Sequence, residues 1–120
     1  GHAITSTTIA GTELQPSPAA NKVSATAPVA VTVKLLNGGE SDEKNVTVTV
    51  TLTAPGAKPV TAKKVVNQTT AGSETDVAIA LPSVPAGGTA ATLTVKVDAV
   101  PGETGTDNNE ATYTVLFAGG

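Results

Sequence analysis

Aliphatic residues and threonines alternate along most of this chain, and that alternation limits what the chain can fold into. The clearest run, at 46–53, reads Val-Thr-Val-Thr-Val-Thr-Leu-Thr. Because successive side chains leave opposite faces of a β-strand, this run places its aliphatic residues on one face and its hydroxyls on the other. Related patterns predict further strands at 4–9, 29–36, 60–66, 77–81, 93–97 and 111–117.

Glycine and proline clusters separate these runs and end each predicted strand. They are Pro16-Ser17-Pro18, Asn37-Gly38-Gly39, Ala54-Pro55-Gly56, Thr70-Ala71-Gly72-Ser73, Pro85-Ala86-Gly87-Gly88 and Pro101-Gly102. No stretch of the sequence shows the spacing of apolar residues that an amphipathic helix requires. The sequence therefore predicts an all-β fold, a seven-stranded antiparallel β-sandwich with Tyr113 and Phe117 in its core. A closed barrel is the alternative, since the pattern alone does not separate the two.

The composition excludes several classes of protein. The 120 residues suit one domain, and they contain no Cys, Met or Trp and one residue each of His, Phe and Tyr. Without cysteine there is no disulfide and no thiolate nucleophile. The formal net charge of −3 argues against nucleic-acid binding, and no apolar stretch is long enough for a membrane span. With no His, Cys or Arg in the body of the chain, we expect no enzymatic activity.

The first two residues, Gly1 and His2, read as the remnant of a removed purification tag. The sequence therefore predicts a single domain over residues 3–118.

Several short motifs occur in an order that resembles a known family. A strand ends in Asn37-Gly38-Gly39, and a Val-x-Val-Asp strand at 95–98 leads into an acidic loop that ends in Asn108-Asn109 before the last strand. This arrangement resembles the cell-adhesion-related domain found in bacteria (CARDB), over nearly the whole chain after residue 3. The loop departs from the family pattern in that Asp107 directly precedes the asparagine pair.

The resemblance implies an immunoglobulin-like sandwich in a secreted or cell-surface protein of bacteria or archaea. Such a module would be non-catalytic and monomeric, and would act as an adhesion, interaction or spacer domain. Its partners would be other domains of the same chain, a surface protein or a glycan. The alternative is a carbohydrate-binding module attached to a secreted enzyme, although sugar sites usually need exposed aromatic rings.

The acidic loop before the last strand is the candidate metal site. Calcium takes oxygen ligands, and Asp98, Glu103, Asp107 and Asn109 could supply them. Glu110 and Asn108 lie in the same loop. The spacing of an EF-hand is absent, and a solvated loop with an Asx-turn explains the same residues. We therefore expect no cofactor, with calcium as the one candidate.

Three other patterns receive structural interpretations. Glu40, Asp42 and Glu43 are read as a charged, solvated turn. An isopeptide bond from Lys34 or Lys96 to Asn108 or Asn109 would require a core-facing lysine, and alternation places both lysines on the opposite face. The glycosylation patterns Asn45-Val46-Thr47 and Asn67-Gln68-Thr69 arise easily by chance in a threonine-rich chain.

Overall fold

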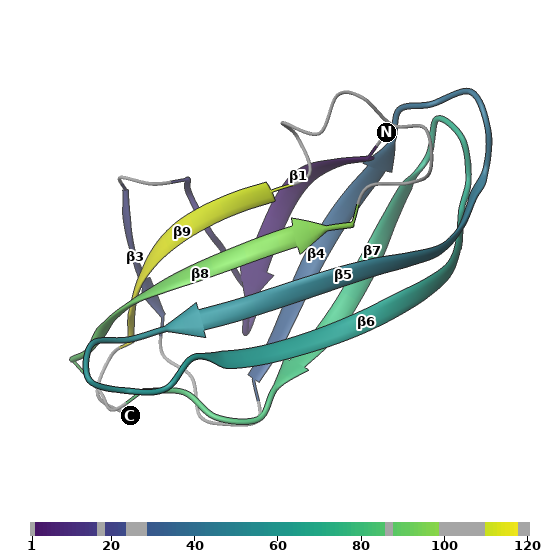
Figure 1. Cartoon of the computed structure of the whole chain (residues 1–120). Coiled ribbons are helices and arrows are strands. Elements are labelled where there is room, and N and C mark those ends of the chain that lie inside the picture. The colour runs from purple at the N-terminus through teal and green to yellow at the C-terminus, as the bar shows by residue number, and fades with distance from the viewer. Residues whose placement is uncertain (1, 17–18, 24–28, 86–87, 99–109, 118–120) are drawn as a thin grey trace.

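The computed structural model describes residues 2–16, 19–23, 29–85, 88–98 and 110–117, and they form two β-sheets (Figure 1). One sheet has the order β2-β1-β4-β7, with β1 His2–Ile9, β2 Thr12–Glu13, β4 Val29–Asn37 and β7 Glu74–Leu81. The other has the order β3-β9-β8-β5-β6, with β3 Ala20–Val23, β5 Glu43–Thr53, β6 Val60–Thr69, β8 Ala90–Val97 and β9 Glu110–Phe117. Two separate sheets favour the sandwich over a single closed sheet.

The predicted alternation is confirmed in the central strands. Each inward row is at most a few per cent exposed, and the fully buried members include Val31, Val33 and Leu35 of β4, Val48 and Val50 of β5, and Leu93 and Val95 of β8. Tyr113 and Phe117 of β9 are also buried, as expected. Because β-branched residues fit a pleated surface and burial removes their side chains from water, local preference and core packing favour the same structure.

The structure corrects the predicted strand count and the predicted direction of pairing. The described residues contain nine strands, not seven, because the segment between β1 and β4 forms the short strands β2 and β3. In addition, β3 pairs with β9 in parallel, over Ala20–Val23 and Thr114–Phe117, so the sheets are not wholly antiparallel. The sequence hides these strands, since two and four residues are too few to show a period of two.

His2 is also part of the fold, although the prediction left it out. It is the first residue of β1, its backbone is aligned with Asn37, and its side chain is 1% exposed.

Strand β6 forms at the predicted place but buries less than its aliphatic residues suggested. Val60 and Val66 are half-buried and Val65 is 53% exposed. Val65 is exposed because it aligns with Thr47 on the outward face of the sheet. The inward Val60 and Val66 are only half-buried because β6 lies at the edge of its sheet, with one neighbouring strand. Lys63 and Lys64 are exposed on this edge, and charged side chains there discourage pairing with the edges of other molecules.

The two ends of the sandwich differ in their buried side chains, which are polar at one end and apolar at the other. We call the end with His2, Asn37 and Thr69 the amino pole, and the end with Leu52, Leu81 and Phe117 the carboxyl pole. The molecule measures 44 × 25 × 24 Å along its principal axes. Strand β1 starts at the amino pole and β9 ends at the carboxyl pole, so the described chain begins and ends at opposite poles (Figure 1).

The face assignment can be tested by placing one charge on each face of β8. Val95→Asp introduces an unpaired carboxylate at a position that is 0% exposed. The cost of several kcal/mol is comparable to the whole stability of a small domain, so we expect no cooperative thermal unfolding by circular dichroism. Thr92→Asp, on the exposed face, should change stability by less than about 1 kcal/mol. A near-normal melt for Val95→Asp would show that the face assignment is wrong.

Candidate functional site

Asn37 occupies the position in β4 where the inward row reaches the amino pole. Its side-chain amide, which is 1% exposed, donates to the Ser41 carbonyl at 3.0 Å and to the carbonyl and hydroxyl of Thr69 at 3.2 and 3.3 Å. Its Oδ1 accepts the Gly39 amide at 3.0 Å, forming an Asx-turn. Asn37 therefore joins β4 of one sheet to β6 of the other and shapes the connection to β5.

His2 adds a second link at the same place. Its Nε2 lies 2.7 Å from the Thr69 hydroxyl, and both side chains are 1% exposed. Thr69 thus contacts two strands of the opposite sheet. We call His2, Asn37 and Thr69 the polar cluster.

Sequence reasoning found Asn37 as a turn residue but missed the cluster. The available signal was the alternation itself, because residues 29, 31, 33 and 35 point inward and 37 continues that row. An inward asparagine predicts a buried amide that needs partners.

Asp42 ties the neighbouring loop in place. Its two carboxylate oxygens accept hydrogen bonds from the Ala71 amide at 2.9 Å and from Gln68 Nε2 at 3.1 Å. The acidic turn at 40–43 therefore contacts the turn between β6 and β7. These contacts give Asp42 a structural role in the loop.

A second set of polar contacts lies between the terminal strands. The Thr7 hydroxyl of β1 donates to the Tyr113 hydroxyl of β9 at 2.8 Å, in the core and between the two sheets. Asn21 of β3 donates to the Thr114 carbonyl of β9 at 3.0 Å. Asn21 also exchanges hydrogen bonds with the backbone of Gln15, at 2.7 and 2.9 Å. We call Thr7, Tyr113, Asn21 and Thr114 the terminal-strand contact.

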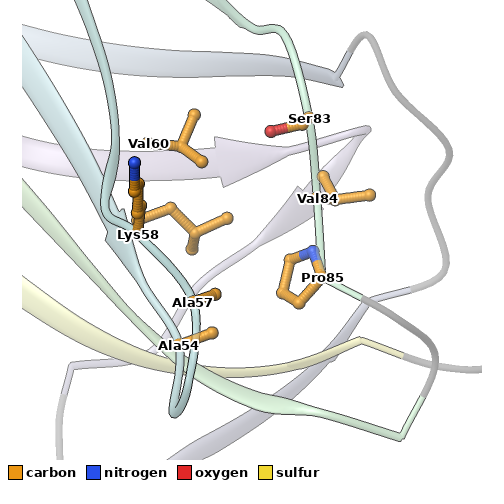
Figure 2. Close-up of a pocket in the computed structure, with 8 residues that line it drawn as sticks. Ala54, Ala57, Lys58, Val60, Ser83, Val84 and Pro85 are labelled. Atoms are coloured by element: carbon orange, nitrogen blue, oxygen red, sulfur yellow. The ribbon is translucent and has the colours of Figure 1, made fainter.

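A small cavity opens at the carboxyl pole, between the β5–β6 turn and the segment after β7 (Figure 2). Its volume is about 150 Å³, which is small beside the roughly 300–1,000 Å³ of most ligand pockets. Leu52, Val60, Val84 and Pro85 form much of its apolar wall. Its polar side chains are Lys58 and Ser83, and both are exposed to solvent.

Of the four residues predicted to bind calcium, the structure describes Asp98 alone. Asp98 is exposed, and its backbone amide donates to the Thr47 carbonyl at 2.9 Å. Glu103, Asp107, Asn108 and Asn109 lie outside the described residues. Within the described residues, no three metal-binding side chains of the His, Cys, Asp or Glu type gather at one point. The calcium site stays a prediction.

The remaining candidate residues lie on the surface. Lys34 is half-buried and Lys96 is exposed, and each lies on the face opposite the core valines beside it. Neither lysine therefore meets the core-facing requirement of an isopeptide bond. Asn45 and Asn67 are both exposed, and Asn45 adopts a left-handed conformation (φ 56°) within β5. In the second pattern, the Thr69 hydroxyl is engaged in the polar cluster.

Comparison with protein-family models gives no match along this chain, and comparison with curated proteins gives no similar sequence. In the part of the chain that the structure describes, no helix has the length and apolar character needed to cross a bilayer. The geometry of the described residues therefore carries the functional argument.

The polar cluster generates a test with a matched control. Asn37→Ala removes the amide and leaves the buried Thr69 carbonyl with one partner fewer, so the free energy of unfolding should fall by about 1–3 kcal/mol. Asn67→Ala, at an exposed site, should change it by less than about 0.5 kcal/mol. Urea denaturation measures both values. A loss below about 1 kcal/mol for Asn37→Ala would mean that the cluster contributes little.

Proposed function

We propose that this chain is a non-catalytic, immunoglobulin-like module of an exported bacterial or archaeal protein, and that it acts as a spacer between its neighbours. The observation that carries the proposal is the position of the two described ends. The chain enters at one pole and leaves at the other, and aliphatic core residues fill the length between them.

The order of the strands supports the immunoglobulin-like assignment. Strands β1, β4 and β7 form one layer and β9, β8 and β5 form the central part of the other. The first part of the chain divides between the layers, since β1 pairs with β4 while β3 pairs in parallel with β9. Divided first strands of this kind occur in immunoglobulin-like sandwiches.

The CARDB resemblance fits the role of Asn37. The motif Asn37-Gly38-Gly39, on which the resemblance partly rests, closes the inward row of β4 and bridges the layers. Because these hydrogen bonds give the motif a role in holding the fold together, they support a non-catalytic, structural module. Attachment to an extracellular or cell-surface protein remains part of the proposal.

The character of the faces favours a spacer over a sugar-binding module. Both aromatic side chains, Tyr113 and Phe117, are buried, so neither forms a stacking platform for a sugar. Among the described residues, Val65 is the one large hydrophobic side chain that is exposed. Outward threonines cover much of the β5–β8–β9 face, where Thr51, Thr94 and Thr112 are aligned across the strands.

Small-angle scattering of one, two and three copies joined end to end tests the spacer role. Because the described ends, His2 and Phe117, lie at opposite poles, each added copy should lengthen the particle by close to the 44 Å long axis. An increment near the 25 Å width would mean that neighbouring copies fold back side by side, and that result would contradict the spacer. A single copy with the same linker attached is the control for the length that the linker adds.

A further inference from the structure

We propose that this domain resists tension applied between its two ends, because its terminal strands are loaded along their own axes. The inference rests on the proposed spacer function and adds a mechanical property to it. Tension on His2 draws β1 outward at the amino pole, and tension on Phe117 draws β9 outward at the carboxyl pole (Figure 1). The two forces therefore act in opposite directions along the long axis.

Strand β1 is held in shear against β4. The pairing runs from His2–Asn37 at the amino pole to Ile9–Val31 near the carboxyl pole. A pull directed along the strand loads these hydrogen bonds together, whereas a pull across it would break them one after another. Because the force is shared, sliding β1 out requires many bonds to break in one step.

Strand β3 repeats this arrangement against β9. The two strands are parallel over Ala20–Val23 and Thr114–Phe117. Once tension passes through β1 and β2, it draws β3 toward the amino pole while β9 is drawn the other way. The hydrogen bond from Asn21 Nδ2 to the Thr114 carbonyl spans this sliding pair. Two backbone hydrogen bonds hold the end of β9. The Phe117 carbonyl accepts a hydrogen bond from the Gly88 amide at 2.6 Å, and the Phe117 amide donates to the Thr89 carbonyl at 3.1 Å.

Buried side chains connect β1 directly to the opposite sheet. The Thr7 hydroxyl is 2.8 Å from the Tyr113 hydroxyl, and these two residues belong to the two strands that the forces separate. His2 makes a second connection through Thr69. A hydrogen bond weakens steeply with distance and angle, so it opposes sliding at once, whereas an apolar contact is non-directional and tolerates a small displacement.

The chain contains no cysteine, so Gly1→Cys with Gly120→Cys gives two unique thiols for attaching handles in optical tweezers. Unfolding is then timed at constant force. Tyr113→Phe removes the hydrogen bond to Thr7, and we expect unfolding under load to become about fivefold faster, which corresponds to about 1 kcal/mol in the barrier. Equal lifetimes for Tyr113→Phe and the parent would overturn the role of this contact.

A double variant separates mechanical resistance from equilibrium stability. Thr7→Val with Tyr113→Phe replaces both partners by apolar groups of similar shape, which can leave stability nearly unchanged. The proposal expects stability close to that of the parent but unfolding under load still as fast as in Tyr113→Phe. Ile79→Val in β7 is the opposite control, since it removes a buried methyl group away from both terminal strands, which lowers equilibrium stability but should keep the parent lifetime. The proposal would be overturned if lifetimes under load followed equilibrium stability instead, with a shorter lifetime for Ile79→Val and the parent lifetime for the double variant.

A second pulling direction gives the most direct contrast. Glu40→Cys with Ser73→Cys attaches the handles at two exposed sites at the amino pole, in the β4–β5 and β6–β7 connections. This pull crosses the strands and should unfold the same protein at a clearly lower force. Equal forces in the two directions would overturn the proposed resistance. The end-to-end length measured by scattering would be unaffected, so failure of this inference is distinguishable from failure of the spacer function.

Discussion

The structure depends on a single constraint, the burial of alternate side chains between two sheets. A period of two lets each central strand present aliphatic residues to the core and hydroxyls to water. Valine and threonine are nearly the same shape and both favour strands, so the chain changes polarity from one face to the other without losing local preference. The core can therefore be built from small aliphatic residues over the whole length, with Tyr113 and Phe117 as its aromatic members.

Polar contacts then determine how the two layers are fixed relative to each other. Hydrophobic burial is non-directional and does not by itself fix the register of one sheet on the other. Hydrogen bonds between buried groups are directional, and a buried group without a partner costs about 1–3 kcal/mol. Asn37 with Thr69 at the amino pole and Thr7 with Tyr113 farther along β1 provide such contacts. The same contacts join the terminal strands to the opposite layer, which links the packing of the core to the proposed mechanical role.

The alternation was sufficient to predict the central strands and the two-layer architecture, because the burial of residues such as Val33, Val50 and Val95 follows directly from the period. It was not sufficient for β3, whose four residues show no pattern and whose pairing depends on a distant strand, Thr114–Phe117. The incomplete burial of Val60 and Val66 was not predictable for a related reason, since whether β6 has one neighbour or two is a property of the whole sheet. For the candidate site, Asn37 was visible as a turn residue, but its contact with Thr69 joins residues 32 positions apart. The burial of His2 could not be predicted, since a single polar residue at the start of the sequence is not part of any alternating pattern.

Amide hydrogen exchange, followed residue by residue by NMR, tests the two-layer account most directly. A central strand has a neighbouring strand on each side and the core against its inner face, so its amides should exchange only with global unfolding. An edge strand can open locally at a lower free energy. We expect the slowest exchange in β4, β5 and β8, at free energies that match the global value from denaturation. Outward amides of the edge strand β6 should exchange much faster. Equal protection of β6 and β5, or weak protection throughout β8, would contradict the account.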